Sequence, residues 1–517
     1  LNHYEMGYLL PHLLKDGRGA LDVYFTRVFN PVWTFPDGFT WIEVLSDSKL
    51  IGCHVALTPT WNETAYFADY VLPMGHASER HDINSYETHA GVWIAFRQPV
   101  LREQARREGR PVTFTHEVNP GEVWEEDEFW IELSWRIDRD GDMGIREHFI
   151  SPYRPGKKIN IDEYYQYLFD HTPGLPETAA KKGLSPLDYM RTYGAFQVED
   201  KVYNLHLKPL SDQEMDGATV QPGGEITKGD MLIGIQTANG TAKGFPTPSH
   251  RQEFYSATMA EFGWADQAIP GYIRSHIHPD NLKDGEYALT PTFRLPTHIH
   301  SRSANSKWLT EIAHRNPIWI HTSDAAKLGV KTGELLKMET EIGYFIDKVW
   351  VTEAIRPGVV ACSHHIGRWR RSHDAGNRWM SNTVAVEQTS PGVWKMSTVA
   401  GVEPFDSNDK DSTRIWWRDG GVHQNITHAV HPDPISGAHC WHQKVRLTKP
   451  GPGERYGDIV VDTNKSFAIF KEWNKLAKDR ETHPGGLRRP LWMNRPLAPT
   501  REYFYLKKEP PAPNGKT

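Results

Sequence analysis

The part of the sequence that constrains the fold most begins at residue 287, where short β-forming runs alternate with glycine and proline turns. The runs occupy residues 317–321, 335–339, 347–352, 359–362 and 444–447. One short helix, residues 323–328 with Ser323 as its N-cap, is expected among them. Many short strands between turn residues are typical of a closed barrel, which leaves no open sheet edge. We therefore predict a mixed β-barrel domain over residues 285–450.

A different order of elements precedes this barrel. A strand is expected within residues 21–29, a helix near 40–48 and a second strand at 70–73. Strand, helix and strand in this order are typical of a parallel α/β unit. Residues 1–100 are therefore predicted to be the end of an α/β, Rossmann-like domain.

Two regions remain outside these domains. Residues 101–284 are expected to form an irregular α+β region, because proline, glycine and tyrosine interrupt any clear period between residues 150 and 230. Residues 451–517 are expected to be a C-terminal extension that ends in a proline-rich tail.

Charge and cysteine usage exclude several classes of protein. The 517 residues carry a formal net charge of −6, so no global basic field points to nucleic acid. No apolar run approaches the roughly 18 residues that a membrane helix needs. Cys53, Cys362 and Cys440 form no C-x-x-C pair, so a zinc ribbon or an iron–sulfur cluster built within the chain is not expected. We expect three separate reduced thiols.

Four stretches carry recognisable motifs. The first is NETAYFADYVLP at residues 62–73, the second is the more divergent stretch 79–91, and the third is GFPTPSHRQEFY at 244–255. The fourth and most specific is the series 292–303, 324–334, 351–360 and 425–437 within the expected barrel. Their order and spacing resemble the molybdopterin oxidoreductases of the dimethyl sulfoxide reductase family.

The resemblance implies a fold and a cofactor. It implies a double-psi-like barrel that binds, together with a dinucleotide-binding α/β portion, two molybdopterin guanine dinucleotides around molybdenum or tungsten. It also implies that the region 101–284 returns to the family's first domain and to the α/β domain. The residues expected to contact the cofactor are Thr58, Asn62, Arg294, Leu295, His298, His300, His364, His365, Asn425, His442 and Gln443.

The side-chain chemistry of this set suits the cofactor. A guanidinium such as that of Arg294 can donate two hydrogen bonds to a phosphate, and the amide of Asn425 can donate to and accept from a ring edge. His298 and His300 alternate along a strand and are expected to share one face. No catalytic residue and no metal ligand are assigned within the chain.

Other interpretations of the same residues stay open. The histidine pairs 298/300 and 364/365 are also compatible with a zinc or copper site, or with structural histidines that contact no ligand. Asn62 is also placed to cap a helix. Arg368, Arg370 and Arg371 around Trp369 fit a solvated turn as well as a phosphate-binding or substrate-entry patch.

The family's cluster cysteines and its metal-ligating residue are not found in this chain. We therefore expect the chain to begin inside a longer subunit, whose N-terminal part would bind the iron–sulfur cluster. The expected partners are that N-terminal part, a small-molecule substrate and an iron–sulfur electron-transfer subunit, without nucleic acid. The resemblance places such proteins in the bacterial or archaeal cytoplasm or periplasm.

Two segments bear on the substrate. Residues 85–99 look most like formate dehydrogenases, and a formate dehydrogenase-like oxidoreductase is the preferred function. Residues 298–312 lean toward arsenate, thiosulfate, polysulfide and tetrathionate reductases, which are the alternative. An alternative of another class is a non-catalytic scaffold subunit of a respiratory complex that has lost the metal. The sequence contains neither G-x-S-x-G nor H-E-x-x-H, which argues against a hydrolase.

Overall fold

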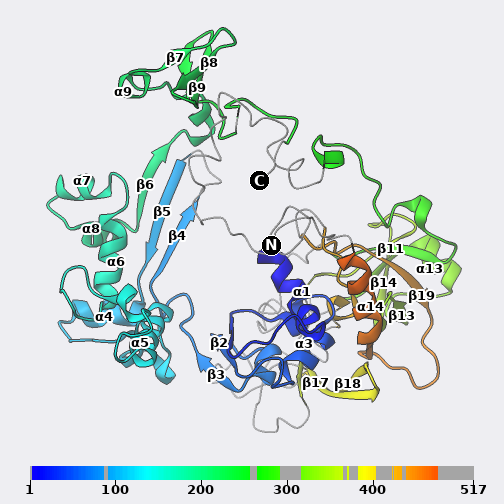
Figure 1. Ribbon diagram of the computed structural model, residues 1–517. Coiled ribbons are helices and arrows are strands. Elements are labelled where there is room, and N and C mark those ends of the chain that lie inside the picture. The colour runs from blue at the N-terminus through cyan, green and yellow to red at the C-terminus, as the bar shows by residue number, and fades with distance from the viewer. Residues whose placement is uncertain are drawn as a thin grey trace. The chain divides into compact units, whose positions relative to one another are not determined.

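The computed structural model describes residues 3–86, 91–247, 249–256, 265–291, 316–364, 369–371, 382–402, 422, 424–433 and 438–475. The chain divides into two compact units (Figure 1). Unit 1 comprises Leu1–Leu72 and Gly271–Met493, and unit 2 comprises Pro73–Pro270 and Asn494–Thr517.

Six strands of unit 1 close into a barrel. They are β11 (Glu286–Thr290), β12 (Ile318–His321), β13 (Leu335–Glu339), β14 (Gly343–Thr352), β15 (Val359–Ala361) and β19 (Gln443–Thr448). The order around the ring is β12-β15-β11-β19-β13-β14, and β14 pairs back with β12. The pairs β11–β15 and β12–β14 are parallel and the others antiparallel, which confirms the predicted mixed barrel. Its core contains fully buried Leu289, Ile320, Leu336 and Phe345.

The barrel sheet extends beyond the ring through β14. The added strands are β20 (Ile459–Asp462), β18 (Val393–Val402), β17 (Asn382–Ser390) and β16 (Trp369–Arg371). A side chain at Gly343 would place a Cβ 1.9 Å from the carbonyl oxygen of Val460, so the close pairing of β14 with β20 requires glycine there. Helix α14 (Thr463–Asn474) follows β20, and Asp462 caps its first turn.

The short barrel helix α13 (Thr322–Leu328) corrects one prediction. Its N-cap is His321, whose Nδ1 accepts a hydrogen bond from the backbone N–H of Ser323. Ser323 itself lies in the first turn. The imidazole takes the capping role because the helix begins one residue earlier than expected and directly continues β12.

The N-terminal part of unit 1 contains one parallel crossover. Strand β1 (Tyr24–Arg27) pairs in parallel with β2 (His54–Thr58), and helices α2 (Pro31–Thr34) and α3 (Gly38–Leu45) lie between them in sequence. The 3₁₀ helix η1 (Thr64–Phe67) leads to β3 (Tyr70–Pro73), the third strand of this sheet. Helix α1 (His3–Lys15), which the sequence did not predict, precedes the sheet.

This small sheet does not confirm a Rossmann-like domain. It has three short strands within the part of the chain that the structure describes. Phe39 and Trp41 of α3 belong to the same hydrophobic core as Leu289 and Ile320 of the barrel. The α/β segment therefore shares the barrel's core instead of forming a separate one.

Unit 2 is built on an antiparallel sheet of β4 (Asp82–Tyr86), β5 (Gly91–Arg97) and β6 (Ala195–Asp200). Its helices are α4 (Val100–Arg107), α5 (Glu126–Ile137), α6 (Ile161–Asp170), α7 (Leu175–Ala180) and α8 (Pro186–Tyr193). Helices α6 and α8 lie beside β5 and β6 (Figure 1), and Phe96 of β5 packs with Tyr165 and Phe169 of α6.

Three of these helices, α6, α7 and α8, lie between residues 150 and 230, where the sequence showed no clear period. Asn160 and Glu163 form a capping box at the start of α6, and Ser185 caps α8 ahead of Pro186. A tyrosine-rich pattern obscured the helical period here, although the caps were visible in the sequence.

The remaining elements of the described chain are short. Unit 2 also contains α9 (Asp212–Met215) and a four-stranded antiparallel sheet of β7 (Thr219–Val220), β8 (Glu225–Lys228), β9 (Met231–Thr237) and β10 (Gly240–Ala242). The other 3₁₀ helices are η2 (Thr115–Glu117), η3 (Pro120–Glu122), η4 (Arg146–Phe149), η5 (Val202–Leu207), η6 (Ala265–Gln267), η7 (Pro279–Asn281) and η9 (Gln424–Thr427). None of the described helices has the length and apolar character needed to cross a bilayer. The three cysteines are free thiols, as expected.

Candidate cofactor site

Two buried amides join the end of β15 to the segment around η9. Asn316 Nδ2 donates to the carbonyl oxygens of Ser363 (2.9 Å) and Val422 (3.2 Å), and the Ser363 N–H donates to Asn316 Oδ1 (2.6 Å). Gln424 Nε2 donates to the Ser363 carbonyl oxygen as well (3.2 Å). Both amides are at most 1% exposed, so their bonds hold the two segments together without competition from water.

This connection brings together two of the residues that the sequence singled out. Asn425 Nδ2 lies 3.3 Å from His364 Nδ1 and donates to the carbonyl oxygen of Thr34 at 2.9 Å. Asn425 is fully buried and His364 is 7% exposed. Asn425 thus links the barrel segment to α2 of the α/β segment.

His428 lies one 3₁₀ turn after Asn425 and has no hydrogen-bond partner on either ring nitrogen within the described structure. It is fully buried. Burial lowers the pKa of His428 well below its usual range, and the neighbouring His439 and His364 lower it further. Leaving such a polar group unsatisfied costs about 1–3 kcal/mol, so a neutral ring with two open positions calls for a ligand or an ordered water.

His439 presents a second open position. Its Nε2 lies 3.1 Å from the carbonyl oxygen of Ala429, whereas Nδ1 has no partner in the described part of the chain. Burial lowers the pKa of His439 to about 3, so the ring is neutral at physiological pH. Nε2 therefore carries the proton that it donates, and Nδ1 remains an acceptor.

Aromatic rings surround these histidines. The ring centroid of Trp441 lies 4.5 Å from that of His364 and 4.8 Å from that of His439, both in edge-to-face geometry. Tyr8 lies 5.0 Å from His439 and stacks on Phe35 at 4.6 Å. The arrangement combines flat apolar walls with neutral hydrogen-bonding atoms, which suits a planar polar heterocycle.

Thr58 and Asn62 lie in the turn after β2. Asn62 Oδ1 accepts from the backbone N–H of Ala65 at 3.0 Å, and its Nδ2 lies 3.4 Å from Thr58 Oγ1. Asn62 thus precedes Glu63, the N-cap residue of η1, and its side chain accepts from the first turn of that helix.

Of the other residues predicted to contact the cofactor, His442 and Gln443 are described by the structure and the rest are not. Gln443 is 1% exposed and donates from Nε2 to the Cys440 carbonyl oxygen at 3.3 Å, and the carbonyl oxygen of His442 lies 3.2 Å from His276 Nε2. Arg294, Leu295, His298, His300 and His365 lie outside the described residues, as does Arg368. Among the described residues, no group of His, Cys, Asp and Glu is arranged to hold a metal ion.

Several residues that organise the site were not predicted. Glu63 is fully buried, accepts from Asn30 Nδ2 at 2.7 Å, and accepts from the backbone N–H of Trp369, 306 positions away, at 3.1 Å. The signal available in the sequence was a glutamate within the family motif at residues 62–65. Asn316, Gln424, His428 and His439 were also missed, because burial rather than local pattern defines their roles.

Known proteins share similarity with the barrel segment and with longer parts of the chain. Residues 289–393 match the family described as "Molydopterin dinucleotide binding domain". The molybdopterin-containing subunit of thiosulfate reductase from Salmonella typhimurium is 25% identical over 308 residues, which cover 60% of this chain and 33% of that protein. A tetrathionate reductase subunit from Archaeoglobus fulgidus is 23% identical over 398 residues, covering 68% of this chain and 32% of that protein.

One further relative and one solved structure are also similar to this chain. Trimethylamine-N-oxide reductase 1 from Escherichia coli is 24% identical over 341 residues, covering 61% of this chain and 31% of that protein. The structure of acetylene hydratase from Pelobacter acetylenicus superimposes with a TM-score of 0.50 at 16% identity, covering 83% of this chain and 44% of that one.

Residues 289–393, which include most of the barrel strands, are therefore similar to molybdopterin dinucleotide-binding domains. These similarities support the resemblance of the chain to the molybdopterin oxidoreductases of the dimethyl sulfoxide reductase family. Its aligned part spans about a third of the length of these curated relatives.

Proposed function

We propose that this chain holds the pterin cofactor of a molybdopterin-dependent reductase that transfers two electrons to a sulfur oxyanion such as thiosulfate or tetrathionate. The observation that carries the proposal is the buried group of His364, Asn425, His428 and His439, on a barrel matched to pterin-binding proteins. Two of the relatives named above are reductases of sulfur oxyanions. The preference for formate has no support among those relatives, so the reductase alternative replaces it.

The residues present fit a pterin. A pterin edge alternates ring nitrogens, an amide and an amino group, so it needs neutral donors and acceptors at short spacing. The orphan Nδ1 and Nε2 of His428 and the orphan Nδ1 of His439 are such atoms. When bound, the pterin-held metal supplies the redox chemistry, while the protein supplies position and electrostatics.

The protonation state of these rings matters for what the chain does. Burial keeps His428 and His439 uncharged, so His428 presents one acceptor nitrogen and one N–H, whereas His439, whose N–H donates to Ala429, presents one acceptor. Hydrogen bonds from neutral groups orient a cofactor and tune its potential without adding a full charge beside it. We assign the two histidines the role of positioning the pterin rather than exchanging protons with substrate.

The other proposed cofactor contacts rest on the family resemblance of the sequence. Arg294, Leu295, His298, His300 and His365 are proposed to bind the dinucleotides, together with Thr58, Asn62, His442 and Gln443. The division of the chain into domains at residues 1–100, 101–284, 285–450 and 451–517 is likewise a prediction. An iron–sulfur electron-transfer subunit is proposed as partner, since two of the relatives are named as subunits.

The substrate proposal is tested on the complete holoenzyme with reduced viologen as electron donor. We expect oxidation of the dye with thiosulfate or tetrathionate, and slower or no oxidation with trimethylamine N-oxide. Activity with formate alone, measured as reduction of the oxidised dye, or with the N-oxide alone would overturn the sulfur-oxyanion assignment while leaving the cofactor site intact.

The scaffold alternative needs a separate measurement. Denaturing the purified protein should release guanine nucleotide together with molybdenum or tungsten. A preparation that contains neither would support a non-catalytic scaffold and contradict the proposed function.

A further inference from the structure

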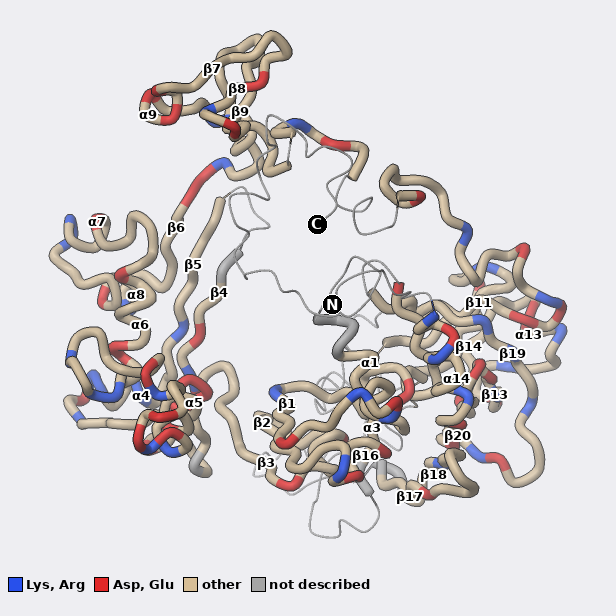
Figure 2. The backbone as a smooth tube through the Cα atoms, in the orientation of Figure 1, with Lys and Arg blue, Asp and Glu red and all other residues tan. Residues whose placement is uncertain are grey.

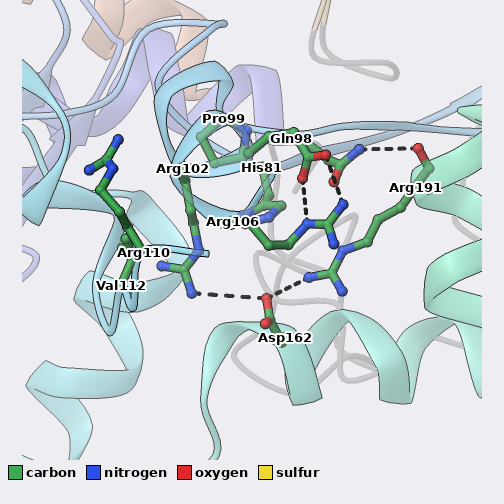
Figure 3. A pocket seen from close by; sticks show the side chains of 10 residues that line it. His81, Gln98, Pro99, Arg102, Arg106, Arg110, Val112, Asp162 and Arg191 are labelled. Atoms are coloured by element: carbon green, nitrogen blue, oxygen red, sulfur yellow. Dashed lines mark hydrogen bonds and ion pairs between the residues drawn. The ribbon is translucent and has the colours of Figure 1, made fainter. Parts of the chain in front are cut away.

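A pocket in unit 2 is lined by four arginines. Arg102 and Arg106 come from α4, Arg110 from the turn after α4, and Arg191 from α8. The pocket has a cavity volume of about 80 Å³, and its lining side chains are drawn in Figure 3. Glu103 and Asp162 are the carboxylates among the lining residues, and Glu128, Glu108 and Asp188 pair with Arg102, Arg110 and Arg191 from outside the lining.

Two of the arginines are held in place before any ligand arrives. Arg102 is 12% exposed and donates from Nη1 to Glu128 Oε1 at 2.9 Å and to Thr115 Oγ1 at 3.1 Å. Arg191 is 15% exposed, and its guanidinium donates from Nη2 to Asp162 Oδ1 at 2.9 Å and lies with Nη1 3.6 Å from Asp188 Oδ1. Guanidinium groups fixed by such contacts lose little freedom when they bind an anion.

Donor atoms remain unused in the pocket. Arg106 gives Nε and Nη2 to Glu103, at 2.7 and 2.8 Å, which leaves Nη1 without a bond in the described structure. Arg191 Nε is buried and has no hydrogen-bond partner among the described residues. A guanidinium has five N–H groups, so each of these side chains can bind a second anion beside its own carboxylate.

Asp162 shows where an anion is stabilised. Its Oδ1 lies 2.9 Å from Arg191 Nη2 and 3.9 Å from Arg102 Nη2, and the side chain is 46% exposed. Figure 3 shows this carboxylate between the two guanidinium groups, with the Arg106 guanidinium next to that of Arg191. A half-exposed carboxylate is a weak competitor for two nearly buried cations, because water still solvates it.

We propose that this pocket binds a small dianionic oxyanion, of which sulfate, phosphate and thiosulfate are examples, with Arg106 and Arg191 as its principal donors. Oxyanion edges match the planar fork of arginine, and the unused donors of Arg106 and Arg191 can bind different oxygens of one such anion. The acidic residues in the first turn of α5, which Figure 2 marks in red along the backbone, disfavour a large polyanion such as nucleic acid. The site lies wholly within unit 2 and does not rest on the proposed pterin chemistry.

The test is calorimetric titration of the whole protein with sodium sulfate, phosphate and thiosulfate at constant ionic strength. We expect saturable binding with a dissociation constant of about 0.1–1 mM, typical of a few charge-assisted hydrogen bonds to a small ligand. Comparable affinity for the three anions supports a site defined by charge and shape, and preference for thiosulfate supports a narrower sulfur-oxyanion site.

Two variants make opposite predictions. Arg106→Gln, a change at a half-exposed side chain, should weaken binding about tenfold. Asp162→Asn removes the competing charge and should tighten binding about threefold or more, a gain that a purely structural ion-pair network would not produce. Arg136→Gln, at an exposed arginine of α5 outside the pocket, is the matched control and should bind as the native protein does.

Absence of saturable binding up to about 10 mM would overturn the proposal, since weaker association is non-specific at that ionic strength. So would equal affinities of the Arg106→Gln, Asp162→Asn and Arg136→Gln variants. Circular dichroism of each variant shows whether the fold is retained. If Arg106→Gln does not fold, the gain expected from Asp162→Asn still decides the question.

Discussion

Nδ2 of Asn425 lies 3.3 Å from Nδ1 of His364, although 61 positions separate the two residues in the chain. An amide nitrogen can only donate, so Nδ1 of His364 is the acceptor and a neutral ring carries its proton on Nε2. This contact selects the tautomer of a residue proposed to face the pterin. It also connects the segment after β15 to η9, which contains Asn425.

Asn425→Ala is expected to lower both stability and cofactor content. The change removes the donor to the Thr34 carbonyl oxygen and to His364, and it leaves buried acceptors unsatisfied at a cost of about 1–3 kcal/mol. Urea unfolding measures the stability, and guanine nucleotide released on denaturation measures the cofactor. Asn239→Ala, at an exposed loop position, should change neither quantity; equal losses in both variants would contradict the assigned role.

His428→Leu should separate stability from cofactor binding. The substitution removes two buried ring nitrogens that have no hydrogen-bond partner in the described structure, so the cofactor-free protein should be as stable as the native one or more stable. Cofactor retention should fall severalfold, because the proposed pterin contacts are lost. His148→Leu, at an exposed position, serves as control. If His428→Leu keeps its full complement of guanine nucleotide, His428 does not bind the pterin.

Acid should destabilise unit 1 through its buried histidines. The pKa of His439 is about 3 in the folded state against 6.5 in the unfolded chain, so its contribution to stability is present above pH 6.5 and is lost as pH falls toward 3. In that pH window each such histidine lowers the free energy of unfolding by about 1.4 kcal/mol for each unit by which the pH falls. The measurement is the urea midpoint of the cofactor-free protein between pH 7.5 and 4.5. His439→Leu should flatten the curve, and an unchanged slope would show that the ring is not buried and neutral.

The stability of unit 2 should depend on pH in the opposite direction, because of Glu128. Burial, reinforced by the charge of Glu125, raises the pKa of Glu128 to about 8, whereas the unfolded value is 4.5. The contribution of such a carboxyl to the free energy of unfolding is fully present below pH 4.5. It is lost as pH rises through about 8. Glu128→Gln, which keeps the shape of the side chain, should remove this decline in thermal unfolding between pH 5 and 8. Parallel curves for the native protein and the variant would refute the shift, and exposed Glu147→Gln is the control.

The barrel strands were predictable because their signals are local. The predicted run 335–339 coincides with β13, and the run 359–362 differs by one residue from β15. Turn residues on both sides and β-forming side chains within the runs suffice for such elements. Helices α6 and α8 were missed because their tyrosine-rich sequences hide the period, although Asn160 and Ser185 are good caps.

The site was predictable in part. His364 and Asn425 were singled out from motifs, and the structure brings them into contact. His428 and His439 were not, since nothing in a local pattern distinguishes a histidine that loses its water from one that remains solvated. The same holds for Glu63, whose partner Trp369 is 306 residues away.

By itself the sequence determined where the strands of the barrel run and which family motifs they carry, because strand propensity and turn chemistry act over a few residues. Only the tertiary structure decided that the ring closes through β12 and β14 and that the α/β segment shares its core. It also decided the protonation states of His428 and His439, and the tautomer of His364. Burial and hydrogen-bond partners depend on packing between distant segments, and these quantities set a side chain's charge and its open positions.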